Sequence, residues 1–196
     1  MGFLKNYGII IAIIAAVWLF NSSDDELEVT DNLDLKHILD VTAKTIERYQ
    51  GGLEGKENLD PNDTLVGLAD RLSADYSVAQ PAIHTTQIGV SAQDDASLLA
   101  YEDPNFNKTL DEGEAALFKI EIDGDQQRII ASSRSGAVND HHFSGTGLLA
   151  GYLIGSMLTR QRGAGVTSSQ MAAKKPVTAQ AAARSRAGSG SHSRGK

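Results

Sequence analysis

Apolar residues follow three patterns along this chain. Two uncharged runs, 7–20 and 143–158, are mainly apolar, the segment between them shows the periods of helices and strands, and the segment after them has almost no branched apolar residue. Unbroken runs are typical of membrane helices, and periodic ones of a folded domain. The pattern predicts an α+β domain, with two helices and a short antiparallel sheet, flanked by two membrane helices and a tail.

Two amphipathic helices are expected at the start of the domain, which we place at 35–140. Over 35–49 apolar residues recur at helical spacing after Asp34, a suitable N-cap. A shorter helix, 64–74, is expected after Asp63. Its inward residues share one face, namely Leu65, Leu68, Ala69 and Leu72.

Four stretches then show a period of two and predict strands, namely 83–90, 97–102, 115–122 and 127–133. A two-residue turn at 123–124 would place Lys119 opposite Arg128. A four-residue loop at 123–126 would instead place Glu121 opposite Arg128, and we expect this register because like charges repel across strands, although Asp-Gly favours the shorter turn. The polar residues 139–142 are expected to be a junction before the second apolar run.

Residues 1–20 are predicted to be a signal anchor. Lys5 provides a positive flank, and Trp18 falls near the outer interface. A cleaved signal peptide is the alternative, because the run is as short as a signal-peptide core, but the polar residues 21–23 make a poor cleavage site. We therefore expect a retained anchor, followed by an acidic linker at 21–34.

The second run is predicted to be a glycine-zipper membrane helix over 143–159. Sixteen residues at about 1.5 Å each cover roughly 24 Å, against a hydrocarbon core of about 30 Å, so a re-entrant or a buried soluble helix are alternatives. Small residues at every fourth position let two helix backbones approach closely. Both runs carry such a stripe, namely Gly8, Ala12, Ala16 and Gly147, Gly151, Gly155.

Charge is sharply divided between segments. All 25 acidic residues lie in 24–140, which holds nine Lys and Arg and carries −16, whereas the segment from 159 onward carries +8. Because Lys and Arg bias flanking segments to the cytoplasm, we predict a bacterial inner-membrane protein embedded in the lipid bilayer. Both termini would be cytoplasmic, with residues 21–142 periplasmic or extracellular.

The segment 160–196 is predicted to be a disordered basic tail. It consists largely of Ala, Ser, Gly, Lys and Arg, which cannot bury a core. The tail could contact anionic lipid headgroups, or it could serve topology and solubility alone. No nucleic acid partner is expected, since the tail lacks aromatic side chains for base stacking.

One stretch, 103–114, resembles a calcium-binding loop. Oxygen-bearing side chains fall at positions one, three, five, seven, nine and twelve, namely Asp103, Asn105, Asn107, Thr109, Asp111 and Glu114. Lys108 departs from the pattern, because the sixth position normally takes glycine for a sharp turn. Two interpretations therefore stay open, a Ca²⁺ site and a plain acidic turn between strands.

No arrangement of residues predicts catalysis. The chain has no cysteine, which excludes disulfides, thiolate nucleophiles and cysteine metal sites. His141 and His142 could bind a metal, but adjacent residues rarely point at one ion. No nucleophile motif surrounds any serine. We therefore expect that the protein is not an enzyme and needs no cofactor, Ca²⁺ excepted.

Short motifs in the second half carry a resemblance. They are ADRL at 69–72, LLAY at 98–101, IEID at 120–123, HFS at 142–144 and LAGYL at 149–153. In this order they resemble small uncharacterised bacterial envelope membrane proteins, often encoded near phage-shock-type membrane-remodelling proteins. The resemblance covers about residues 65–160 and implies an envelope accessory role with no catalytic residues.

Together these patterns favour a non-enzymatic inner-membrane accessory or assembly protein of the cell envelope. It would act as a homo-oligomer or with a membrane-protein partner. Two alternatives stay open. One is an exported calcium- or ligand-sensing domain, and the other is a glycine-zipper oligomer that forms a pore.

Overall fold

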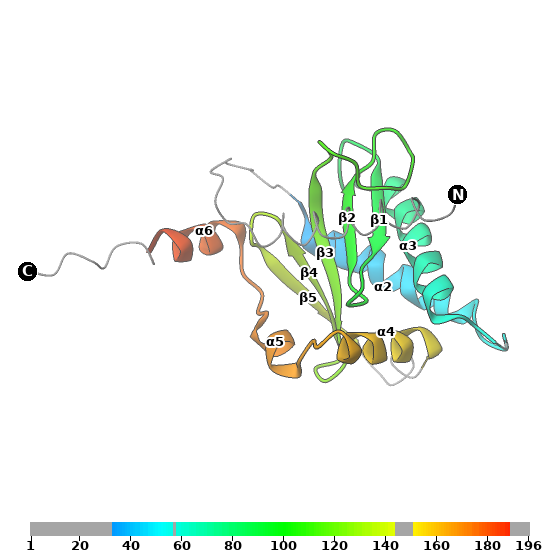
Figure 1. Cartoon of the computed structure of the whole chain (residues 1–196). Helices are drawn as coiled ribbons and strands as arrows, with labels where there is room; N and C mark the ends of the chain where they lie inside the picture. The colour runs from blue at the N-terminus through cyan, green and yellow to red at the C-terminus, as the bar shows by residue number, and fades with distance from the viewer. Residues whose placement is uncertain (1–32, 57, 144–150, 189–196) are drawn as a thin grey trace, which may run out of the picture.

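The computed structural model describes residues 33–56, 58–143 and 151–188. They form an α+β domain in which helices α2 and α3 cover one face of a five-stranded antiparallel sheet (Figure 1). The strands follow one another in the order β1-β2-β3-β4-β5. The elements are α2 (Leu35–Gly51), α3 (Pro61–Ser77), β1 (Ile88–Ala92), β2 (Leu98–Glu102), β3 (Ala116–Asp123), β4 (Arg128–Ser133), β5 (Val138–His142), α4 (Tyr152–Gly163), α5 (Ser168–Ala173) and α6 (Ala179–Gly188).

Side-chain caps set the beginnings of both long helices. Asp34 accepts hydrogen bonds from the backbone N–H groups of the second and third residues of α2, at 3.1 and 3.0 Å, as predicted. Helix α3 begins three residues earlier than expected. Asp60, and not Asp63, is its N-cap, because Asp60 is followed by Pro61, whose fixed φ suits the first helical position.

The core lies between the helices and one face of the sheet. Tyr76 of α3 meets Phe118 of β3 edge to face, with ring centroids 5.4 Å apart. Alternate residues of the strands face these helices, as a period of two requires. Those that are buried are Ile88, Val90, Leu98, Ala100, Phe118, Ile120, Ile122, Ile129 and Ala131.

The hairpin between β3 and β4 has neither of the two registers considered from sequence. Asp123 lies opposite Arg128, and Ile122 lies opposite Ile129. The loop is therefore 124–127. An acidic residue does face Arg128 as expected, but it is Asp123 and not Glu121.

The polar residues expected to be a junction form the edge strand β5. It pairs antiparallel with β4, placing Asp140 opposite Ile130 and His142 opposite Arg128. This strand was not predicted because its residues are mostly polar and show no alternation of apolar and polar positions. Such residues suit an edge strand, which must discourage further pairing.

The predicted membrane helix over 143–159 is wrong. Residues 144–150 lie outside the described residues, and α4 begins only at Tyr152 and has 12 residues. Its apolar side chains, Leu153, Ile154 and Met157, are buried in the core of the domain. In the ranges that the structure describes, no helix is long and apolar enough to cross a membrane.

The inner-membrane localisation is corrected for the same reason. A hairpin with both termini cytoplasmic and residues 21–142 exported needs a second span, and the segment assigned to that span is a core helix of the domain. The signal anchor at 1–20 and the linker up to residue 32 lie outside the described residues. So do Gly8, Ala12, Ala16 and Gly147.

The prediction of a disordered tail over 160–196 is also wrong for its described part. Residues 160–188 complete α4 and form α5 and α6, and they run along the β5 side of the sheet (Figure 1). Composition correctly indicates that this segment builds no core of its own. Contacts with the folded domain hold it in place instead.

Candidate functional site

A buried arginine organises the end of the sheet nearest α5. Arg128 begins β4 and its side chain is only 3% exposed. Its Nε donates to Asp123 at 3.1 Å and its Nη1 donates to Asp140 at 2.6 Å. Burial by itself lowers the pKa of Arg128, but the hydrogen bonds to Asp140 and Asp123 outweigh it and raise the pKa above its ordinary value.

The same guanidinium binds the C-terminal segment through its main chain. Nη1 donates to the carbonyl oxygen of Lys174 and Nη2 to that of Met171, each at 2.9 Å. These carbonyls lie at the end of α5, where the carbonyl of Met171 also accepts from the backbone N–H of Lys174 at 3.1 Å. Arg128 therefore caps α5 from inside the domain.

Further contacts continue along the segment, which we call the C-terminal strap, residues 167–188. The ammonium group of Lys174 pairs with Glu121, which is almost fully buried. Val177 forms an antiparallel bridge with Val138, with both N–H···O distances at 2.8 Å. Beyond it, Arg186 donates to the carbonyl oxygen of Ser135.

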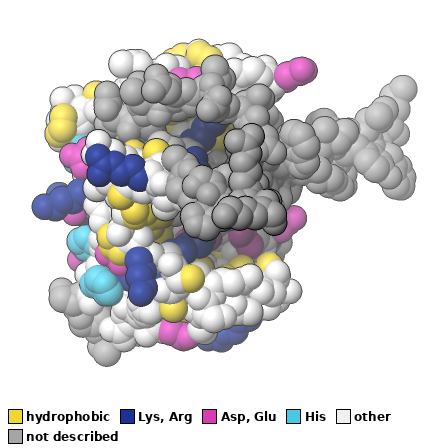
Figure 2. All heavy atoms as spheres, turned by 90° about the vertical axis from the view of Figure 1, so that its left-hand side faces the viewer, with side chains coloured by type: hydrophobic (Ala, Val, Ile, Leu, Met, Phe, Trp, Pro, Cys, Tyr) yellow, Lys and Arg dark blue, Asp and Glu magenta, His cyan; other side chains and the backbone are white. Residues whose placement is uncertain are grey.

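The strap contacts combine charge complementarity with main-chain recognition. Arg128 and Val138 contact backbone atoms of the strap, so these contacts do not depend on which side chains the strap carries. Glu121 adds selectivity for a basic residue through Lys174. On the side where β5 lies, Lys, Arg and His side chains occur among hydrophobic and acidic ones (Figure 2). The arrangement can hold a basic segment that consists of two short helices and the stretch between them.

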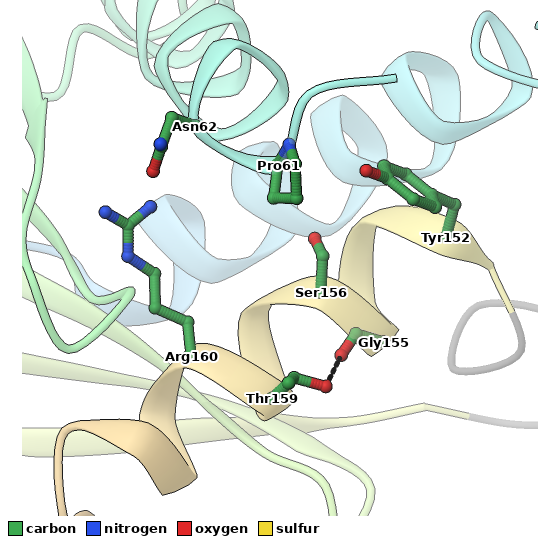
Figure 3. Close-up of a pocket in the computed structure, with 7 residues that line it drawn as sticks. All are labelled: Pro61, Asn62, Tyr152, Gly155, Ser156, Thr159 and Arg160. Carbon is green, nitrogen blue, oxygen red and sulfur yellow. Dashed lines mark hydrogen bonds between the residues drawn. The ribbon is translucent and has the colours of Figure 1, made fainter. Parts of the chain in front are cut away.

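An open hollow of about 570 Å³ lies between the start of α3 and α4. Arg160 extends from α4 toward Asn62, and Thr159 donates to the carbonyl oxygen of Gly155 at 2.9 Å (Figure 3). The helix N-terminus at this hollow is already capped by the Asp60 carboxylate. The N-terminus of α3 therefore gains little from binding a further anion.

The zipper glycines that the structure describes do not share one neighbour. A Cβ at Gly151 would lie 2.0 Å from the side chain of Gln50, so Gly151 allows α4 to begin against the end of α2. A Cβ at Gly155 would meet nothing within 4 Å. Tyr152 between them donates to the carbonyl oxygen of Leu59 at 2.6 Å.

The predicted calcium loop connects β2 to β3. Asp103 is buried, whereas Asp111 accepts at Oδ2 from the amide groups of Asn105 and Asn107, at 2.9 and 2.6 Å. Within the described residues, no three His, Asp or Glu side chains are already gathered as a metal site. Calcium binding stays a prediction.

The histidines of β5 point in different directions. His141 lies 3.6 Å from Asp40 of α2, while His142 lies 3.7 Å from Asp140. Successive residues of a strand face opposite sides of a sheet. These two rings therefore do not converge on one metal.

Sequence reasoning missed the site around Arg128. One weak indication of the site was present in the sequence, because the repulsion of like charges across strands favoured an acidic residue opposite Arg128. Nothing local connected that arginine to Met171 and Lys174, more than forty positions away. Comparisons with protein families, curated proteins and solved structures found no match. The resemblance to envelope proteins stays a prediction.

Proposed function

We propose that this chain is a non-enzymatic assembly or accessory protein whose domain binds a basic segment made of two short helices and the stretch between them. In one chain that segment is its own strap, and in an assembly it is the strap of a second copy. The single observation that carries the proposal is the buried Arg128, which donates to two backbone carbonyls of the strap while Asp123 and Asp140 balance its charge.

Exchange between copies is supported by how the strap is attached. Only the linker 164–166 joins α4 to the strap, and Gly165 in it has a φ of +81°, a conformation that glycine adopts without strain. Domain swapping exchanges an identical element between two copies of a chain, and a short linker allows this element to pack on either copy. Every contact made within one chain can be made between two.

A designed disulfide tests the proposal directly. Val138 and Val177 form a hydrogen-bonded antiparallel pair, whose Cα atoms lie about 5.5 Å apart, within the range of a disulfide. The chain has no other cysteine. In the double variant Val138→Cys, Val177→Cys, we expect a disulfide inside the monomer at low concentration and a covalent dimer as concentration rises.

Mixing differently tagged copies before oxidation distinguishes exchange from random collision. Heterodimers should form with the double variant at a yield well above that of Val138→Cys alone, the matched control. If oxidation yields only monomers at every concentration, the strap does not exchange and assembly through it is rejected.

A further inference from the structure

Charged side chains of alternating sign form a row along one face of the sheet and continue into the strap. Lys119 and Glu121 of β3 lie on this face, because Ile120 between them points to the helices on the other face. Lys119 pairs with Asp95, in the turn between β1 and β2, at 3.0 Å. Glu121 pairs with Lys174 of the strap. The row therefore connects the first turn of the sheet to the strap.

Glu121 lies between two lysines. Its side chain is 7% exposed, its Oε2 pairs with Lys174, and its Oε1 lies 3.7 Å from Nζ of Lys119. In the part of the chain that the structure describes, both ion pairs of Glu121 are thus with lysines, one from the strap and one from its own strand. A separation of 3.7 Å is too long for a hydrogen bond. Lys119 therefore faces Glu121 without being bound to it while the strap is docked.

Asp95, the present partner of Lys119, has other hydrogen bonds. Its Oδ1 accepts from the backbone N–H of Ser97 at 3.0 Å and from the hydroxyl of the same residue. Burial by itself raises the pKa of Asp95, but the hydrogen bond from Ser97 and the charge of Lys119 outweigh it and lower the pKa below its ordinary value. The side chain of Asp95 is 29% exposed, so water can replace Lys119 there. Asp95 can therefore release Lys119.

The carboxylates near the strap differ in how they depend on it. Asp123 and Asp140 accept from Nε and Nη1 of Arg128, which belongs to the domain, so they keep their cation when the strap leaves. Glu121 loses Lys174, and a buried carboxylate without a cation is strongly destabilising. A lysine carries its charge on a flexible four-carbon stem with rotatable donors. Lys119 can therefore turn from one carboxylate to the next.

We propose that Lys119 takes the place of Lys174 on Glu121 whenever the strap leaves the domain. This role rests on the proposed function, in which the strap exchanges between copies. Nζ of Lys119 moves from Asp95 to Oε1 of Glu121, and it moves back when a strap docks again, whether from the same chain or from a second copy. By stabilising the detached state, Lys119 sets how often the strap opens.

Amide hydrogen exchange of the full chain measures this opening. The N–H groups of Val138 and Val177 donate to each other's carbonyl oxygens and exchange when the strap detaches. Lys119→Gln should slow their exchange at least about threefold, as expected for loss of a modest ion pair, because detachment then leaves Glu121 without a cation. Lys108→Gln is the matched control. It makes the same charge change on a lysine that pairs with α3, and it should leave the exchange unchanged.

A double variant separates replacement by Lys119 from general attraction between charges. In the chain that keeps Lys119, Lys174→Gln should raise the exchange rate little, because Lys119 then pairs with Glu121 in the docked state as well. In the Lys119→Gln chain, the same change should raise the rate by a factor at least about threefold larger. Equal factors in the two chains, or no slowing by Lys119→Gln alone, would overturn this role of Lys119 and leave the proposed function intact.

The same exchange data also test whether the strap detaches by itself. In the unmodified chain, the amides of Val138 and Val177 should exchange faster than those of β3, which exchange on opening of the core. If both groups of amides exchanged only together, the strap would not detach from a folded domain. That result would reject the proposed function along with the role of Lys119.

Discussion

At the scale of single residues, the structure depends on charged groups that are buried together. Arg128, Asp123 and Asp140 share one cluster, and Arg128 and Asp123 are each 3% exposed. A buried ion pair stabilises little compared with apolar residues of the same shape, but removing one partner leaves an uncompensated charge. The cluster is therefore better understood as a device that fixes where the strap lies than as a source of stability.

Replacing Arg128 tests this at the residue scale. Arg128→Ala should lower the free energy of unfolding by about 3–5 kcal/mol, because two carboxylates and two carbonyls lose their donor. Urea denaturation followed by circular dichroism measures the change. Arg134→Ala, on an exposed neighbour beyond the same strand, should change it by less than about 0.5 kcal/mol. Similar values for the two variants would contradict a central role for Arg128.

At the scale of elements, α4 shows how one apolar pattern serves two environments. Its buried apolar residues, Leu153, Ile154 and Met157, have helical spacing, which suits a membrane helix and a core helix equally well. The distinction lies in the opposite face. Thr159 and Arg162 there are exposed, and in the structure they face solvent where a membrane helix would face lipid.

A cavity variant tests the packing of this element. Ile154→Ala should lower the free energy of unfolding by about 2–5 kcal/mol, the usual loss for a fully buried aliphatic side chain. Arg162→Ala on the exposed face of α4 serves as control and should change it little. If Ile154→Ala were as mild as the control in a chemical denaturation experiment, α4 would not belong to the core.

At the scale of the whole molecule, the strap brings the basic C-terminal segment of the sequence into contact with the acidic domain. An acidic domain and a basic C-terminal segment occur in one chain, and the structure pairs them through Glu121 and Lys174. The basic segment therefore has a folded partner within the molecule. Contact of its remaining basic residues with anionic lipid headgroups stays a prediction.

Truncation tests the strap as a unit. A chain ending at Val166 should have a free energy of unfolding about 1–3 kcal/mol lower than one ending at Gly188, because Arg128 loses two backbone acceptors. Both chains lack residues 189–196, so they differ only in the strap. Thermal and urea unfolding of the two chains measure the difference in stability. Equal stability would mean that the strap rests on the domain without stabilising it.

The sequence by itself determined the elements whose signals are local. The N-cap at Asp34, the inward face of α3 and the apolar alternation of β3 each depend on residues within a few positions of one another, and the structure contains all three. Such signals can be recognised because helix and strand periods are properties of the backbone alone.

Tertiary structure alone decided everything that depends on which surfaces meet. The strand at 138–142, the burial of α4 and the docking of the strap join positions far apart in the chain. The hairpin register around Arg128 is local, but its sequence signals favoured other pairings. Apolar segments gain free energy by leaving water, whether the environment they enter is lipid or a protein core. The sequence shows that such a segment must be shielded from water. Only the folded chain shows which surface shields it.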